Sequence, residues 1–250
     1  MNTKNNYIFF MGFFLLIGIL WFYSKYTIRI ESFNEPDEED NSEETNTTVT
    51  SGNNYKKKSN TKKKQNISTT TSKDDVKCIL LGDSILNNKN YVPPGKSVYD
   101  LINEDIPTVM YARDGDTVSD VYNQITLIPA EQNAEDINIL LSVGGNDFLG
   151  GRPFPLVSKK YSELLKQIKH KMPDCKLYVL NLYYPPTLTF FYNTIKKWNE
   201  FLDTLSSDGS VTGVVDISSM RNEEYFTQKI EPSVTGGELI ADICVKTLQQ

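Results

Sequence analysis

Short apolar runs alternate with segments of helical periodicity from Asp75 to the C-terminus. The runs with the length and character of buried strands are VKCILLG, TVMYA, INILLSVGG, KLYVLNL and GVVDI. Apolar residues recur with helical spacing in the segments near 97–104, 118–127, 156–171, 190–205 and in a last segment that ends near Leu248. Strands that alternate with helices are typical of a parallel sheet with helices on both faces, so the pattern predicts a three-layer α/β sandwich with five parallel strands.

Two of the predicted helices carry additional signals. One apolar stripe follows the positions i, i+4, i+7, i+11 and i+14, which hold Phe191, Ile195, Trp198, Leu202 and Leu205. The sequence Thr235-Gly-Gly-Glu238 has the spacing of a capping box and predicts where the last helix begins.

The first 74 residues follow a different pattern. Residues 7–23 are uncharged and mostly apolar, which favours a membrane anchor within residues 1–30; a cleaved signal peptide is the alternative, but no small-x-small cleavage site follows. Residues 31–74 are polar, with a block of acids and then a block of lysines, and predict a disordered linker. We therefore expect a single-pass membrane protein of undetermined orientation whose folded domain spans residues 75–250.

Charge and cysteine content narrow the function classes. The formal net charge is −6, and acidic side chains outnumber basic ones in the predicted domain, so we expect no nucleic-acid partner. The cysteines, Cys78, Cys175 and Cys244, are far apart in the sequence and never paired at the spacing of metal ligands. We predict no metal and no cofactor, and the sequence does not indicate an oligomeric state.

Polar and aromatic residues follow the predicted strands. The carboxyl ends of parallel strands meet at one edge of the sheet, where binding sites form. The residues at these ends are Asp83 and Ser84 after the first strand, Gly115 after the second, Asn146 and Asp147 after the third, and Tyr183 and Tyr184 after the fourth. A serine with a glycine N–H and an asparagine amide nearby suits acyl transfer, because it supplies a nucleophile and two donors for an oxyanion.

Three of these segments resemble sequence blocks of the SGNH (GDSL-type) hydrolases, which are esterases and lipases with a flavodoxin-like sheet. They are Gly82-Asp83-Ser84, the segment 112–117 and the segment 144–147. The resemblance implies that Ser84 is the nucleophile, that Gly115 and Asn146 complete its oxyanion hole, and that the substrate is a small-molecule ester or an acylated glycan.

The fourth block of that family, Asp-x-x-His, is changed here. The matching positions hold Gln228 and Glu231, and the only histidine of the chain, His170, falls at the end of a predicted helix on the opposite edge of the sheet. Glu231 is therefore the candidate base for Ser84. A glutamate with a pKa near 4.3 is a weak base, so this role requires burial or nearby acids that raise its pKa.

These residues leave two main hypotheses. In the first, the protein is an ester hydrolase with Ser84, Gly115, Asn146 and Glu231 as catalytic residues. In the second, it is an inactive binding module that keeps the pocket on a membrane or particle surface. Under both hypotheses we expect Asp83, Asp147, Tyr183 and Tyr184 to contact the substrate. A third possibility is a tethered structural protein that recruits partners through its charged segments.

Overall fold

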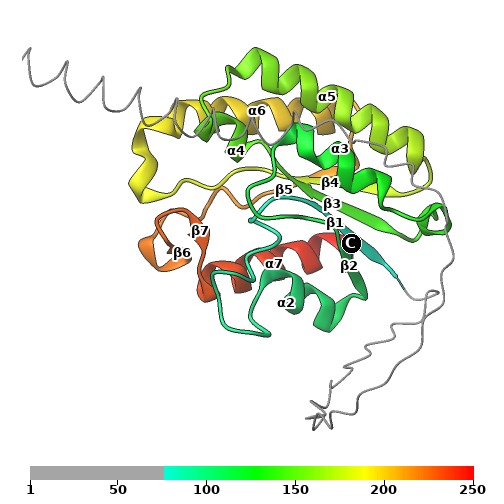
Figure 1. Ribbon diagram of the computed structural model, residues 1–250, viewed down its shortest axis with the longest axis horizontal. Coiled ribbons are helices and arrows are strands. Elements are labelled where there is room, and N and C mark those ends of the chain that lie inside the picture. Colours follow the sequence, from blue (N-terminus) through cyan, green and yellow to red (C-terminus); the bar gives the residue numbers. More distant parts are fainter. Residues whose placement is uncertain (1–75) are drawn as a thin grey trace, which may run out of the picture. The chain divides into compact units, whose positions relative to one another are not determined.

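The computed structural model describes residues 76–250, which form three layers with a sheet in the middle (Figure 1). The predicted membrane anchor, residues 1–30, and the predicted linker, residues 31–74, lie outside the described residues. Within residues 76–250, none of the helices combines the length and the apolar character that crossing a bilayer requires.

The central sheet has five parallel strands, as the alternating pattern predicts. They are β1 (Cys78–Gly82), β2 (Thr108–Met110), β3 (Asn138–Ser142), β4 (Lys176–Leu180) and β5 (Gly213–Val215). Their order is β2-β1-β3-β4-β5, and every neighbouring pair is parallel. This is the doubly wound order in which the chain leaves the central strand in both directions, so that the loops after β1 and β3 diverge and leave a crevice.

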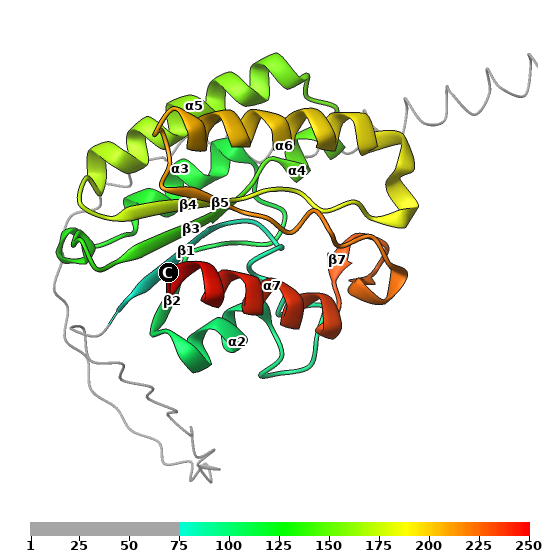
Figure 2. The ribbon, with the colours of Figure 1, turned by 180° about the vertical axis from the view of Figure 1, so that it is seen from behind.

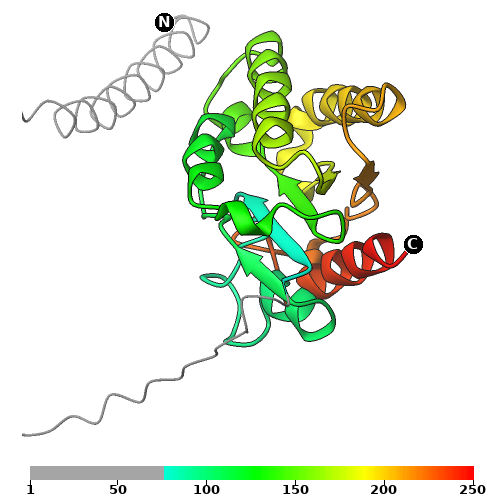
Figure 3. The ribbon, with the colours of Figure 1, turned by 90° about the vertical axis from the view of Figure 1, so that its right-hand side faces the viewer.

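Helices cover both faces of the sheet. On one face lie α2 (Val98–Asp105) and α7 (Val234–Leu248); on the other lie α3 (Val118–Thr126), α5 (Phe154–Lys171) and α6 (Tyr192–Ser207) (Figures 2 and 3). Because the helices bury the sheet from both sides, β1 is buried along its whole length and β3 over all but its first residue.

Short elements connect these layers. The helix α4 (Gly145–Leu149) follows β3 directly, and three 3-10 helices are η1 (Ala130–Gln132), η2 (Pro186–Phe191) and η3 (Glu223–Tyr225). The strands β6 (Phe226–Thr227) and β7 (Glu231–Pro232) form a two-stranded antiparallel hairpin ahead of α7. The periodicity did not predict α4 or this hairpin, because elements of two to five residues are too short to show a period.

The start of α7 differs from the prediction. The N-cap is Ser233, whose hydroxyl accepts a hydrogen bond from the N–H of Gly236 at 3.1 Å, and the predicted capping box of Thr235 with Glu238 is wrong. A Cβ on Gly236 would lie 2.1 Å from the carbonyl oxygen of Tyr225, so glycine is required by the close approach of η3 to the helix.

The apolar stripe of α6 is confirmed with one exception. Ile195, Trp198, Leu202 and Leu205 are buried along the helix. Phe191 precedes the helix and is only half-buried; it packs against the core and also lines a cavity.

Candidate active site

A cavity opens at the carboxyl ends of the strands. Four parts of the chain line it: the turn after β1 with Asp83 and Ser84, the start of α4 with Asn146, the segment from the end of β4 to α6, and β7 with Glu231. It encloses about 590 Å³, part of which is open to solvent. In Figure 1 the β6–β7 hairpin lies at this end of the sheet, toward which the parallel strands point.

A tight turn presents Ser84 at the end of β1. Gly82 has a φ of +124°, and a Cβ there would lie 1.8 Å from the carbonyl oxygen of Ser142 on β3, so only glycine fits. Asp83 closes the turn: its side chain accepts a hydrogen bond from the N–H of Ile85 at 3.1 Å. No hydrogen bond within residues 76–250 uses the N–H of Ser84, so this donor remains available beside the serine hydroxyl.

A buried glutamine supports the same turn. Gln124 on α3 accepts from the N–H of Gly82 at 2.8 Å and donates to its carbonyl oxygen at 2.7 Å. The same amide nitrogen donates to the carboxyl group of Asp116 at 2.7 Å. Sequence analysis missed this residue, because a single glutamine on a helix carries no signal of the loop that it holds.

Glu231 lies beside Ser84 in the cavity lining. Burial raises the pKa of Glu231, the Ser84 hydroxyl beside the carboxyl group lowers it, and the negative charge of Asp114 raises it; the net direction is upward. The Oε2 atom of Glu231 is buried and has no hydrogen-bond partner among the described residues. A buried carboxylate oxygen without a partner is uncommon, because its desolvation is not compensated. The structure thus brings together the two residues that the sequence proposes as nucleophile and base.

Two hydroxyl groups hold the backbone just before Glu231. The Tyr183 hydroxyl donates to the carbonyl oxygen of Ile230 at 2.7 Å, and the Thr187 hydroxyl donates to that of Lys229 at 2.9 Å. Tyr183 also lines the cavity, and its ring packs edge-on against Phe226 of the hairpin, with 5.1 Å between the ring centroids. The residue is therefore in position to contact a ligand, and it also supports the strand that carries Glu231.

A buried asparagine holds the backbone just after Glu231. Asn88, which is fully buried, donates from Nδ2 to the carbonyl oxygen of Pro232 at 3.1 Å and accepts from the N–H of Val98 at 2.8 Å. It thereby connects the segment after Ser84 to the residue that follows Glu231. Sequence analysis missed Asn88, because its partner is 144 residues away in the chain.

Asp83 is a buried acid next to the nucleophile. Burial raises its pKa from 3.8 to about 8; the hydrogen bond from Ile85 lowers it, and the charges of Glu231, Asp147 and Asp116 raise it further. The carboxyl group is therefore mostly protonated at neutral pH. A neutral Asp83 adds no negative charge beside Glu231 under these conditions.

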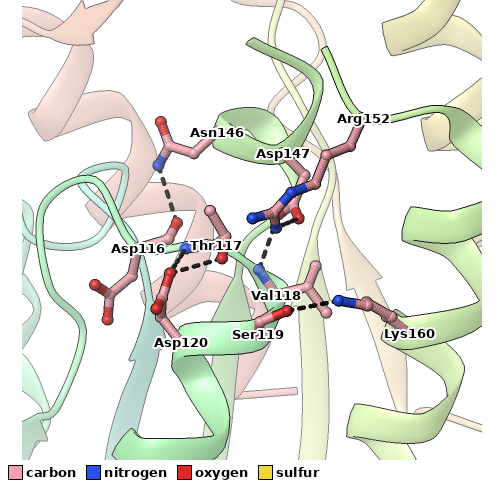
Figure 4. A network of polar contacts seen from close by, with 9 residues as sticks. All are labelled: Asp116, Thr117, Val118, Ser119, Asp120, Asn146, Asp147, Arg152 and Lys160. Atoms are coloured by element: carbon pink, nitrogen blue, oxygen red, sulfur yellow. Dashed lines mark hydrogen bonds and ion pairs between the residues drawn. The ribbon is translucent and has the colours of Figure 1, made fainter. Parts of the chain in front are cut away.

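Of the two predicted oxyanion donors, one lines the cavity. Asn146 lies in the first turn of α4, and its Nδ2 donates to the carbonyl oxygen of Asp116 at 3.0 Å, which leaves its second N–H free to donate into the cavity (Figure 4). Gly115 is exposed, with a φ of +79°, and does not belong to the cavity lining.

Asp147 stabilises the fold beside the site. One carboxylate oxygen pairs with Arg152 at 2.6 Å and the other accepts from the N–H of Val118 at 2.8 Å (Figure 4). Both oxygens are thus occupied, and the residue does not line the cavity, where it was expected to contact substrate. Its role is to tie α4 to the start of α3, near the Asp116 carbonyl that orients Asn146.

Tyr184, the fourth residue expected to contact substrate, lies outside the cavity lining. Its ring lies 4.3 Å from the Arg221 guanidinium and packs edge-on against Tyr192. Gln228 is exposed in the hairpin turn with a φ of 44° and does not line the cavity either. Packing and turn formation therefore account for both residues.

Neither His170 nor Asp216 lines the cavity. His170 is exposed in the last turn of α5, whose C-terminal end lies at the opposite end of the sheet from the hairpin (Figure 1). Asp216 follows β5 outside the cavity; burial opposes ionisation there, but hydrogen bonds from Ser218 and Asn181 lower its pKa. Within residues 76–250, no cluster of His, Cys, Asp or Glu side chains has the arrangement of a metal site.

Comparison with known proteins agrees with this architecture. No protein-family model matches the chain, and no curated protein matches it. Solved structures do. A member of the lipolytic protein G-D-S-L family from Veillonella parvula aligns with a TM-score of 0.60 at 19% identity, over 69% of this chain and 98% of the other.

Two characterised enzymes are also similar in structure. The esterase EstA from Pseudoalteromonas sp. aligns with a TM-score of 0.56 at 17% identity, over 69% of this chain and 96% of its own. The acetyl-xylooligosaccharide esterase Axe2 from Geobacillus stearmophilus aligns with a TM-score of 0.52 at 13% identity, over 69% of this chain and 94% of its own. Residues 76–250 therefore have the α/β fold of the G-D-S-L lipolytic proteins.

Proposed function

We propose that this protein is a carboxylic-ester hydrolase in which Ser84 attacks the acyl carbonyl and Glu231 accepts the serine proton. One observation carries the proposal. The half-buried Glu231 carboxylate, whose Oε2 atom is buried without a partner among the described residues, lies beside the Ser84 hydroxyl, on a cavity that Asn146 also lines. The esterases and lipolytic proteins among the similar structures support the same reaction class.

The reaction has two halves. Ser84 Oγ bonds to the acyl carbon while its proton moves to Glu231, and the N–H of Ser84 and Nδ2 of Asn146 stabilise the oxyanion. The intermediate then collapses, and the alcohol leaves with the proton from Glu231. Water attacks the acyl-serine as Glu231 accepts one of its protons. Release of the carboxylic acid returns the proton to Ser84 and regenerates the free enzyme.

The surroundings of Glu231 make a carboxylate a better base than in water. An ordinary glutamate pKa is far below neutral, but burial and Asp114 raise that of Glu231. Tyr183 and Asn88 donate hydrogen bonds to the backbone on the two sides of Glu231. The segment that carries the carboxylate is therefore already ordered before substrate binds.

The test is hydrolysis of p-nitrophenyl butyrate by the purified full-length protein and by Ser84→Ala. We expect Ser84→Ala to lose at least about a hundredfold in kcat/KM, because the nucleophile is removed. The matched control is Ser207→Ala, which changes an exposed serine at the end of α6 and should leave the rate unchanged. Unchanged hydrolysis by Ser84→Ala, or a folded parent without activity on any ester, would overturn the proposal.

A second function, an ester- or glycan-binding module without turnover, is favoured by one observation. Neither position of the Asp-x-x-His block holds its usual residue, since Gln228 is exposed in a turn and Glu231 replaces the histidine. This function requires that the folded parent bind an ester without hydrolysing it. Product formation that depends on Ser84 would exclude it.

We further propose that residues 1–30 anchor the protein in a membrane. The 17 uncharged residues from 7 to 23 support this placement. Fractionation of cells tests it. Full-length protein should sediment with membranes and be released by detergent, whereas a soluble form that lacks about the first 25 residues would identify a cleaved signal peptide.

A further inference from the structure

The cavity wall away from Ser84 is largely apolar. Phe148 and Leu149 of α4 line it, and so do Leu188 and Phe191 of η2 and Ile195 of α6. The volume of about 590 Å³ includes open space at the mouth of the cavity. These five apolar side chains offer more apolar surface than the methyl group of an acetyl ester can cover.

The cavity lining offers few hydrogen-bond partners to a sugar. Apart from Asp83, Ser84, Asn146 and Glu231, the polar side chains of the lining belong to Tyr183 and Thr194, and the Tyr183 hydroxyl already donates to Ile230. Each buried sugar hydroxyl without a partner is costly, because its hydrogen bonds to water are lost. The wall thus favours an apolar chain over a glycan.

The charges beside the cavity disfavour an anionic ligand. Glu231 lines it, Asp114 acts on Glu231, and no lysine or arginine is present among the described residues of the lining. A phosphate or a carboxylate there would meet negative charge without a cation. An uncharged ester avoids this repulsion, and the carboxylate product is repelled after hydrolysis.

We propose that the substrate of this site is an uncharged ester of an apolar acyl chain of intermediate length, whose chain packs against the apolar lining formed by Leu149, Leu188 and Ile195. This inference rests on the proposed function. At about 30 Å³ for a group of the size of a water molecule, a chain of about six to ten carbons occupies about 180 to 300 Å³. The remaining space accommodates the ester group and the open mouth.

The first experiment measures kcat/KM of the full-length protein for p-nitrophenyl esters with acyl chains of two, four, eight and sixteen carbons, and for acetylated xylooligosaccharides. Burial of each methylene improves kcat/KM about fourfold. We expect a rise from two to eight carbons and a fall at sixteen, where the chain exceeds the cavity. A flat series, or a preference for acetylated xylooligosaccharides, would overturn the inference while the hydrolase assignment stands.

Two variants at one half-buried position locate the chain. Leu188→Trp fills the wall and Leu188→Ser makes it polar, so each should lower the ratio of octanoyl to acetyl ester kcat/KM by at least tenfold. The matched control is Leu127→Trp, at a half-exposed position just after α3 and outside the lining, which should not change the ratio. Unchanged ratios in both Leu188 variants would place the chain elsewhere and contradict the inference.

Ligand binding separates the inference from turnover. Calorimetry of Ser84→Ala with decan-2-one and butan-2-one measures the alkyl-chain site without a reaction. Tighter binding of decan-2-one, weakened by the additional Leu188→Ser change, supports the site even when the parent hydrolyses no ester, in which case only the proposed function fails. Equal or absent binding of both ketones would refute the acyl-chain site.

Discussion

Replacement of Glu231 by glutamine tests the proposed base most directly. The two side chains have nearly the same size, and the strand that carries residue 231 is held through backbone carbonyls that the substitution leaves intact. Oε2 has no partner within the described part of the chain, so glutamine breaks no hydrogen bond at that atom. We therefore expect Glu231→Gln to fold with a stability within about 1 kcal/mol of the parent.

The expected loss of activity follows from the role of a general base. A positioned base contributes about a hundredfold to ten-thousandfold, which corresponds to about 3 to 5 kcal/mol in the activation free energy. Because Ser84 and Glu231 act as a unit, the double change Ser84→Ala with Glu231→Gln should cost hardly more than either single change. Glu223→Gln, at an exposed position of η3, is the matched control and should retain full activity.

The assay is kcat/KM as a function of pH. Glu231 must be ionised to accept a proton, and its pKa is raised, so activity should increase with pH and reach half its maximum above the ordinary range of a glutamate. Asp114, which accepts a hydrogen bond from Tyr91 at 2.7 Å, contributes to that rise. Asp114→Asn should therefore move the midpoint to lower pH, because a negative neighbour is removed.

Two results would refute this reasoning. Activity in Glu231→Gln within a few-fold of the parent would show that another group accepts the proton, and Asp83 would become the next candidate because it also lines the cavity. An acid limb at the ordinary pH of a glutamate, unchanged by Asp114→Asn, would show that a different ionisation controls the rate.

Three further predictions concern stability and the remote histidine. Gly82→Ala should lower the free energy of unfolding by about 3 kcal/mol or more in denaturant titration, because the new Cβ meets the Ser142 carbonyl oxygen. The control Gly95→Ala, with a φ of +78° and no atom within 4 Å of the new Cβ, should cost only about 1 to 2 kcal/mol. Equal costs for the two variants would contradict the clash. Burial raises the pKa of Asp83 from 3.8 to about 8, so the folded state holds a proton that the unfolded chain releases, and the free energy of unfolding should fall as pH rises from about 4 to about 8. Asp83→Asn should remove this loss. If Asp83→Asn raised the melting temperature by the same amount at pH 4 and at pH 8, the result would contradict this prediction. His170→Gln should leave esterase activity within a few-fold of the parent, since His170 is exposed at the far end of α5, and a hundredfold loss with the fold intact would exclude this placement.

The strands and main helices are predictable because their signals are local. The apolar runs of β1 and β3 end in the polar residues Ser84 and Asn146, and parallel pairing brings such ends to one edge regardless of side-chain detail. The placement of Ser84 and Asn146 at one cavity follows from strand order, whereas Glu231 was placed there by the loop before the last helix and by the resemblance to the SGNH hydrolases. Their catalytic roles remain predictions.

The roles of side chains that are adjacent in the sequence depend on contacts with distant parts of the chain, which local sequence patterns do not reveal. Asp147 follows Asn146 directly, yet it pairs with Arg152 and with the start of α3, whereas Asn146 lines the cavity. Tyr183 and Tyr184 are adjacent, yet only Tyr183 lines the cavity, whereas the ring of Tyr184 packs against Tyr192 and Arg221. Composition cannot separate such pairs.

The sequence by itself determined the α/β order and the glycine turn before Ser84, because periodicity and turn chemistry are properties of the chain. Only the tertiary structure decided how Glu231 is held. The hairpin that carries Glu231 is too short to be stable alone. Its backbone accepts hydrogen bonds from the side chains of Asn88, Tyr183 and Thr187, which come from distant parts of the chain. Burial by these elements raises the pKa of Glu231, and that burial exists only after the sheet and its helices have assembled.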